Sequence, residues 1–197
     1  MQEQKAKYFS VGIIAIAFVL FVYVTIQAVA IVQKRQISTD DGIYNNRVTQ
    51  NQAIQQQANQ LVAGCQTDLC KAQKVLSYVT AIPYQINHFK AHSPQQTIRL
   101  NRGDCDDKSN LLISLLHALN IESYFVLVPK HIFVVVALHH KPNTKALWIN
   151  KTPYYILEST AKNSQVGYPL RYKLNQINMI LDPFENREIV VKSLEYG

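Results

Sequence analysis

The stretch Arg102-Gly103-Asp104-Cys105-Asp106-Asp107-Lys108-Ser109 decides the fold, because it places a single cysteine where a helix should begin. Residues 110–120 follow as Asn-Leu-Leu-Ile-Ser-Leu-Leu-His-Ala-Leu-Asn, with apolar positions at the spacing of a buried helix. A cysteine in a first helical turn lies beside unpaired backbone N–H groups and the positive end of the helix dipole. Both favour the thiolate, which is the nucleophilic form. The pattern therefore predicts Cys105 as a candidate nucleophile.

A histidine and a carboxylate follow at the ends of two predicted strands. His131 opens an apolar run that continues to Leu138, and the run Tyr-Tyr-Ile-Leu-Glu-Ser-Thr at 154–160 places Glu158 at the end of another. We prefer His131 to the other histidines because His139 and His140 lie beside a predicted turn. Cysteine, then histidine, then an acid is the chain order of one kind of nucleophilic hydrolase.

These blocks resemble the transglutaminase-like superfamily, a papain-type fold that includes bacterial cysteine proteases and acyl transferases. The resemblance covers residues 76–160 and rests on Ile82-Pro83-Tyr84, the cysteine block, His131 and the run at 154–160. It implies an α+β fold in which the nucleophile helix packs on an antiparallel sheet. It also implies that Cys105 is the nucleophile, His131 the base and Glu158 the orienting acid. The family usually has aspartate at this last position, so Asp182 remains an alternative for the acid.

Three carboxylates, Asp104, Asp106 and Asp107, surround the cysteine. They would raise the pKa of the thiol, which opposes the helix dipole. As N-terminal helix residues they can cap orphan amides, and as a cluster they are weak candidates for calcium, which needs six or more oxygen ligands. Donors for an oxyanion are left open among Gln95, Gln96 and the backbone N–H of Cys105.

The chain of 197 residues has room for one compact domain and additional segments. We divide it into a short tail at 1–10, a transmembrane anchor at 11–32, a polar stalk at 33–63 and a transglutaminase-like domain at 64–197. Residues 11–32 carry no charge and would span about 33 Å as a helix, which suits a hydrocarbon core of about 30 Å. A cleaved signal peptide ending near Ala28-Val29-Ala30 is the competing interpretation.

Cys65 and Cys70 form a close pair that leaves Cys105 as the odd thiol. We expect a disulfide between them, which would indicate an oxidising compartment. Two unpaired thiols are the alternative, and a zinc site is disfavoured because the pair lacks the other ligands. With the anchor, this favours a single-pass protein of the inner membrane whose domain faces the periplasm or the outside of the cell.

The rest of the chain has recognisable periodicity. We expect the stalk to turn helical from about Asn46, a helix at 68–81 that Pro83 stops, and a loop at 88–101. Predicted strands occupy 123–128, 131–139, 146–150, 154–158 and an edge at 189–192, with an irregular excursion at 159–178.

The net charge is +7, and the basic residues are scattered singly along the chain, which disfavours nucleic acid as a partner. The sequence thus predicts a membrane-anchored extracytoplasmic cysteine hydrolase, most simply a protease that acts through an acyl-enzyme. An acyl transferase and an inactive scaffold domain of an envelope assembly are the alternatives. The expected partners are the lipid bilayer, through residues 11–32, and a protein substrate or an envelope protein; no cofactor is expected unless calcium binds.

Overall fold

The computed structural model describes residues 2–34, 36–39, 42–87 and 91–197. The chain divides into two units, Met1–Gln36 and Ile37–Gly197. The first unit is essentially one helix, α1 (Gln2–Lys34). No helix within the described part of the chain is both long and apolar enough to cross a membrane. The predicted anchor at 11–32 falls within α1, but the side chains of residue 11 and of 29–32 lie outside the described residues, and the anchor stays a prediction.

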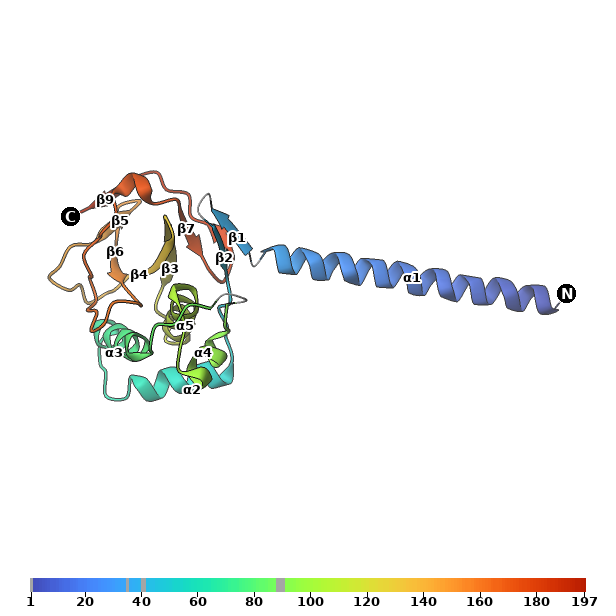
Figure 1. Cartoon of the computed structure of the whole chain (residues 1–197), viewed down its shortest axis with the longest axis horizontal. Helices are drawn as coiled ribbons and strands as arrows, with labels where there is room; N and C mark the ends of the chain where they lie inside the picture. The colour runs from blue at the N-terminus through green and yellow to red at the C-terminus, as the bar shows by residue number, and fades with distance from the viewer. Residues whose placement is uncertain (1, 35, 40–41, 88–90) are drawn as a thin grey trace. The chain divides into compact units, whose positions relative to one another are not determined.

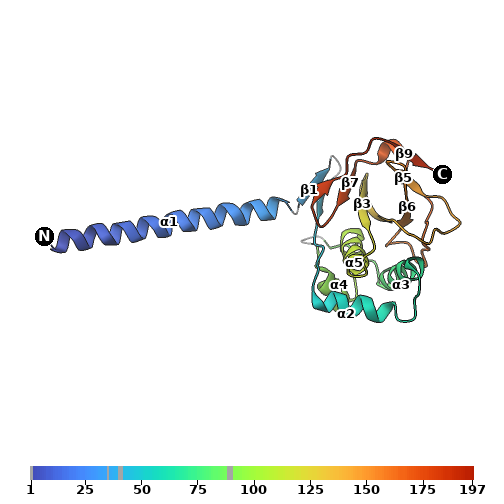
Figure 2. The ribbon, with the colours of Figure 1, turned by 180° about the vertical axis from the view of Figure 1, so that it is seen from behind.

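The second unit packs four helices against one sheet (Figure 1). A small pair of strands, β1 (Gln36–Thr39) and β2 (Gly42–Asn45), precedes the helices. The helices are α2 (Gln52–Leu61), α3 (Asp68–Ala81), α4 (Pro94–Leu100) and α5 (Cys105–Ala118). Both ribbon views show α5 between the sheet and the other three helices (Figure 2). The expected α+β arrangement, with the helix that begins at Cys105 packed on the sheet, is present.

The sheet has the order β8-β7-β3-β4-β6-β5-β9, and all of its paired neighbours are antiparallel. Its strands are β3 (Ser123–Val128), β4 (His131–Val136), β5 (Leu147–Ile149), β6 (Thr152–Leu157), β7 (Met179–Asp182), β8 (Arg187–Glu188) and β9 (Leu194–Tyr196). The central strands are almost wholly apolar because both of their faces are covered. One face packs on α5, and the opposite face, which includes Phe133 and Ile156, is covered by the segment from Tyr168 to Ile177.

The prediction of a polar stalk at 33–63 is wrong for most of its length. The compact unit begins at Ile37, and Ile54, Ala58 and Val62 are buried in the main core. Their spacing of four residues places them on one face of α2, which packs on α5. The many glutamines and asparagines occupy the exposed face of this helix, so a polar composition concealed a docked helix.

Two other segments differ from the predictions. The expected loop at 88–101 contains α4, which begins with a capping box between Ser93 and Gln96 and has Pro94 in its first turn; residues 88–90 lie outside the described residues. The predicted strand at 189–192 is not formed, and β8 and β9 lie on either side of it. The strand β7 was not predicted, although it pairs with β3 through the buried Ile180 and Leu181.

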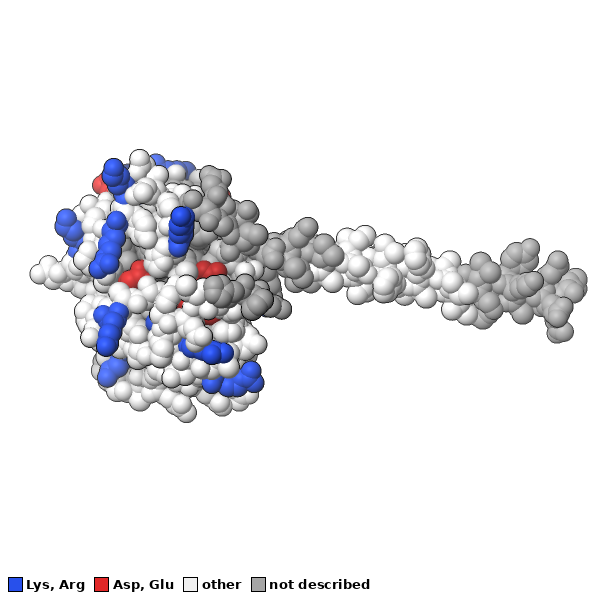
Figure 3. Space-filling view, viewed as in Figure 1, with Lys and Arg blue, Asp and Glu red and all other residues white. Residues whose placement is uncertain are grey.

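Basic side chains are spread singly over the surface seen in Figure 3, as the sequence suggested, and acidic side chains show in the middle of this face. The basic side chains on this face therefore do not form a block.

Candidate active site

Cys105 is the first residue of α5 and is partly buried. The side chain of Asp104 caps this helix, since one of its oxygens accepts the N–H groups of Asp106 and Asp107 at 3.2 Å each. The first-turn N–H of Cys105 itself is not used by this cap. This N–H is thus the natural donor to the oxyanion of a carbonyl group that the sulfur attacks.

Backbone hydrogen bonds of Gly103 fix the turn before Cys105. Gly103 donates its N–H to Pro83 O at 3.2 Å and accepts the N–H of Gln85 at 3.0 Å. A Cβ at position 103 would lie 2.7 Å from the Cβ of Asp107, so only glycine fits without movement. The Ile82-Pro83-Tyr84 and cysteine blocks of the sequence are therefore neighbours in space.

His131 and Glu158 are joined by a hydrogen bond of 2.8 Å between Nε2 and Oε2. His131 begins β4, and Glu158 follows β6, which pairs with β4. The other oxygen of Glu158 accepts the backbone N–H and the hydroxyl of Thr160, at 2.9 and 2.6 Å. Burial acts to raise the pKa of Glu158, but the hydrogen bonds from His131 and Thr160 outweigh it, and the pKa lies below its ordinary value. The acid is thus a carboxylate that holds the imidazole by one nitrogen.

The start of α5 and the end of β6 are brought together one turn beyond the cysteine. The hydroxyls of Ser109 and Ser159 lie 3.2 Å apart in a buried contact. Tyr172 marks the same neighbourhood, because its ring is nearly parallel to that of His131 at 6.2 Å. Burial, and then the charges of Glu158 and of the Cys105 thiolate, raise the pKa of Tyr172.

The structure thus joins His131 and Glu158 directly, and the place of Cys105 beside them stays a prediction. Within the described residues there is no hydrogen bond between Cys105 Sγ and His131; the thiol instead approaches Asp106 Oδ1 at 3.6 Å. Since Glu158 occupies Nε2, Nδ1 is the ring nitrogen that can take a proton from sulfur.

The thiol is not activated by its helix in the way that the sequence suggested. Burial, followed by the charges of Asp106 and Asp104, raises the pKa of Cys105 to about 12. Burial and the charge of Asp104 also raise the pKa of Asp106, to about 7. These effects outweigh the helix dipole, so the free thiol is neutral at physiological pH.

Two of the three acidic neighbours accept hydrogen bonds from backbone N–H groups. Asp104 Oδ2 accepts the N–H of Asn87 at 3.1 Å, while Asp107 Oδ1 accepts the N–H of His92 at 2.5 Å. His92 Nδ1 lies 3.0 Å from Asp107 Oδ2, although the two are not aligned as a hydrogen bond. No group of three or more histidine, cysteine or acidic side chains able to hold a metal ion is found in the part of the chain that the structure describes. Asp104 and Asp107 therefore hold local N–H groups, and calcium binding stays a prediction.

Sequence reasoning missed Lys108, which is fully buried one turn after the cysteine. Its Nζ donates to Ile82 O at 2.8 Å and Thr80 O at 3.5 Å. Burial lowers its pKa to about 8, against the opposing charge of Glu158. No local signal in the sequence marks it, because its burial depends on carbonyl groups from another segment of the chain.

Sequence reasoning also missed a cleft of about 360 Å³ that opens beside His131 and Glu158. Tyr168, Arg171 and Tyr172 form part of its wall, and they belong to the excursion at 159–178 that carries almost no regular secondary structure. No periodicity marks such a segment in a sequence.

The remaining candidates lie elsewhere. Asp182, the alternative acid, accepts the N–H groups of Phe184 and Glu185 in the turn after β7. Gln96 is engaged in the capping box of α4, and Gln95 lines a separate cleft with Arg99.

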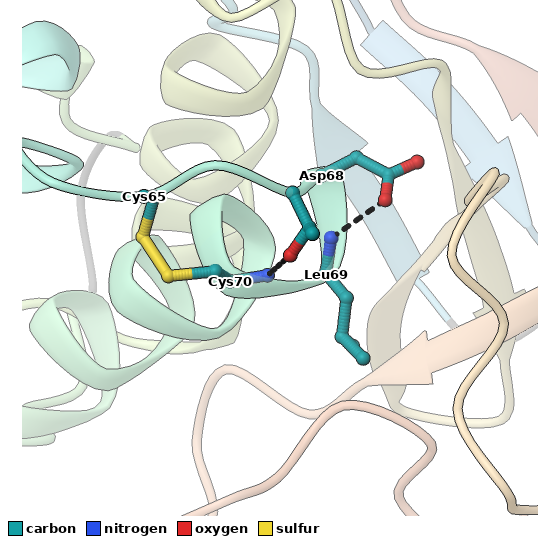
Figure 4. Close-up of a disulfide and its surroundings, with 5 residues drawn as sticks. Cys65, Asp68, Leu69 and Cys70 are labelled. Atoms are coloured by element: carbon teal, nitrogen blue, oxygen red, sulfur yellow. Dashed lines mark hydrogen bonds between the residues drawn. A yellow bond between two sulfur atoms is a disulfide. The ribbon is translucent and has the colours of Figure 1, made fainter.

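Cys65 and Cys70 are joined by a disulfide at the start of α3 (Figure 4). Beside it, Asp68 accepts the N–H of Leu69 at 2.8 Å. The same carboxylate accepts the backbone N–H groups and approaches the Nδ1 atoms of His139 and His140. The disulfide loop therefore ties α3 to the segment after β4.

Three solved structures are similar to this chain at low identity. A protein assigned provisionally as a cysteine protease, from Cytophaga hutchinsonii, is 19% identical over 55% of this chain and 37% of its own, with a TM-score of 0.44. Calcium-bound LapG of Legionella pneumophila is 15% identical over 57% of this chain and 75% of its own, with a TM-score of 0.36. A second structure of LapG is 16% identical over 61% and 78%, with a TM-score of 0.37.

No curated protein matches the sequence. Residues 55–140 match the family model of the transglutaminase-like superfamily. This span runs from α2 to the segment after β4, and so includes Cys105 and His131 but ends before Glu158. The resemblance to the transglutaminase-like superfamily is thus confirmed over these residues.

Proposed function

We propose that this protein is a cysteine hydrolase that cleaves amide bonds, most simply a protease, through Cys105, His131 and Glu158. The observation that carries the proposal is the hydrogen bond of 2.8 Å between His131 Nε2 and Glu158 Oε2. It holds the imidazole in one tautomer and orientation, and the Cys105 helix begins nearby. Glutamate here performs the part that aspartate usually has in the family.

In the proposed reaction, His131 Nδ1 takes the proton of Cys105 as the sulfur attacks a carbonyl carbon. The carbonyl oxygen becomes an oxyanion beside the backbone N–H of Cys105 at the start of α5. His131 then gives its proton to the leaving amine, and an acyl-enzyme remains. Water attacks the thioester with His131 as base, which releases the acid and the thiol. If a substrate amine replaced water, the same site would act as an acyl transferase.

The raised pKa of the Cys105 thiol supports general-base catalysis rather than a resting thiolate–imidazolium pair. It also favours a second candidate, an inactive domain that retains the fold and binds a partner in an envelope assembly. The two candidates differ in whether His131 changes the reactivity of the sulfur.

The decisive experiment measures hydrolysis of a diverse synthetic peptide mixture by mass spectrometry. We expect cleavage by the wild type, none by Cys105→Ala or His131→Ala, and a loss of at least about 100-fold for Glu158→Gln, because the imidazole loses its orientation. His139→Ala is the matched control, since that side chain is exposed and should leave cleavage unchanged. Equal cleavage by wild type and Cys105→Ala would contradict the proposal.

Iodoacetamide alkylation of Cys105 separates the enzyme from the inactive domain without a substrate. An enzyme should react at least about tenfold faster at pH 7.5 than its His131→Ala variant, because the ring removes the proton as sulfur attacks. The same rate in both proteins would favour the binding domain. A rate that rose with calcium and fell with a chelator would return Asp104, Asp106 and Asp107 as metal ligands.

We further propose an extracytoplasmic location, supported by the Cys65–Cys70 disulfide, which persists in oxidising compartments. Attachment to the inner membrane through residues 11–32 is proposed from the sequence alone. Fractionation of cells that express either the full-length protein or a variant without residues 1–36 tests both the location and the membrane attachment.

A further inference from the structure

The cleft beside His131 follows the sheet face that lies opposite α5. Phe133 and Ile156 line it and belong to the core cluster on that face, whereas Cys105 packs against the cluster on the α5 side. The cleft therefore begins at the imidazole and extends away from the nucleophile. Its volume of about 360 Å³ lies within the range of small-ligand pockets.

Chemistry decides which half of a substrate would enter this cleft. In the proposed function, His131 protonates the leaving amine, so that nitrogen must lie within hydrogen-bonding reach of the ring. The acyl half is held at the sulfur. The chain that follows the leaving nitrogen then passes His131 and enters the cleft.

The wall of the cleft presents one cation. Arg171 lies over the ring of Tyr168, with its guanidinium carbon 4.9 Å from the ring centroid, so the aromatic face orients it. All the ion pairs found between described residues involve histidine, and none involves Arg171. The carboxylate of Glu158 also lines the cleft but is engaged by His131 and Thr160. Arg171 is exposed, and among the described residues no carboxylate forms an ion pair with it.

We propose that this cleft binds the amine-bearing half of the substrate through a carboxylate that Arg171 holds. The inference rests on the proposed function, whose site it deepens. A planar guanidinium binds carboxylates in a bidentate manner, and the apolar floor suits the carbon atoms between amine and acid. The carboxylate can come from an acidic side chain directly after the cleaved bond or from a free C-terminus close to it.

The first test compares cleavage of peptide mixtures that share a randomised acyl half. The leaving halves begin with Asp or Glu and end as an amide, begin with Asn or Gln and end as an amide, or are one neutral residue with a free or an amidated C-terminus. We expect kcat/KM to be at least tenfold higher for the halves that carry a carboxylate. The two matched pairs show whether a side chain or a terminus supplies it.

Arg171→Gln should erase this preference and Arg171→Lys should retain part of it. Arg99→Gln is the matched control, because Arg99 lines a different cleft and should keep the full preference. A preference that survives Arg171→Gln, or no preference in the wild type, overturns the proposal.

A second measurement needs no catalysis. The same leaving halves, as free amines, are titrated into the full-length Cys105→Ala protein by isothermal calorimetry. We expect the acidic amines to bind at least tenfold more tightly than the neutral ones, and Arg171→Gln to remove the difference. Tight binding without any peptide cleavage by the wild type would refute the hydrolase and keep the subsite; equal affinities would refute the subsite whatever the cleavage result.

Discussion

At the scale of single residues, the competition around the sulfur is the main result. The N-terminus of α5 favours a thiolate, but burial and two carboxylates raise the pKa of Cys105 to about 12. Asp106 is the closest of them, at 3.6 Å from the sulfur, and its own pKa is raised to about 7. The state of the thiol is therefore set by burial and by its acidic neighbours more than by its helix.

Replacing Asp106 by asparagine should lower the pKa of the Cys105 thiol, because a negative charge beside the sulfur is removed. We expect the pH profile of iodoacetamide alkylation to move to lower pH, and a thiol pKa lower by one would make the rate at pH 8 about tenfold higher. Glu185→Gln, at an exposed carboxylate in the turn after β7, should leave the profile in place. An unmoved profile for Asp106→Asn would mean that the carboxylate does not act on the sulfur.

At the scale of elements, the sequence predicted those whose periodicity is strong. The helix at 68–81 and the strand at 123–128 have the expected bounds, and Cys105 begins its helix as expected. The strand β7 is too short to show a period, and α4 depends on a capping box rather than an apolar face. The docked face of α2 was hidden because Ala58 is small and Ile54 and Val62 stand among glutamines and asparagines.

The same division holds for the candidate site. The three residues at element ends could be predicted, since each one borders a strongly apolar segment. Lys108 and the wall of the cleft could not, because their role depends on carbonyls and rings from distant parts of the chain. Tertiary contacts of this kind leave no local pattern.

Asp68, the first residue of α3, offers a test at the scale of elements. Burial opposes ionisation, but N–H groups and histidine side chains lower the pKa of Asp68 from 3.8 to about 2. A depressed pKa stabilises the fold above the unfolded value near 4, and this stability is lost as the pH falls through about 2. Because His139 and His140 are 96% and 60% exposed, we expect Asp68→Asn to lower the free energy of unfolding by only about 1–2 kcal/mol at pH 7.

The measurement is urea unfolding of both proteins between pH 2 and pH 7. The difference between them should shrink from pH 4 downwards and vanish near pH 2. Glu188→Gln, at an exposed strand end, is the control. A difference that stays constant with pH would assign the effect of Asp68→Asn to lost packing.

At the scale of the whole molecule, the boundary of the compact unit lies far earlier than the sequence predicted. It begins at Ile37 rather than at 64, because β2 and α2 contribute Tyr44, Ile54 and Ala58 to the main core. The helix α5 is consequently covered by α2 and α3 on the side away from the sheet, as both ribbon views show. The segment before α5 therefore packs in the core beside this helix and is more than a spacer.

Truncating Ile54 to alanine should therefore cost about 2–4 kcal/mol of unfolding free energy, since its side chain is 1% exposed within the core. Gln56→Ala, on the exposed face of the same helix, should change stability by less than about 0.5 kcal/mol. Chemical denaturation of the two variants provides the comparison. Equal stabilities would mean that α2 is not docked in solution.

The neutral state of the Cys105 thiol affects how readily this sulfur is oxidised in an oxidising compartment. Oxidants and disulfides react with thiolates, and a thiol with a pKa of about 12 is ionised to only about one part in 10⁵ at pH 7. Burial and the charges of Asp106 and Asp104 therefore disfavour sulfenic acid formation at this sulfur and its exchange with the Cys65–Cys70 bond. A lone cysteine can in this way remain reduced where its two companions are oxidised.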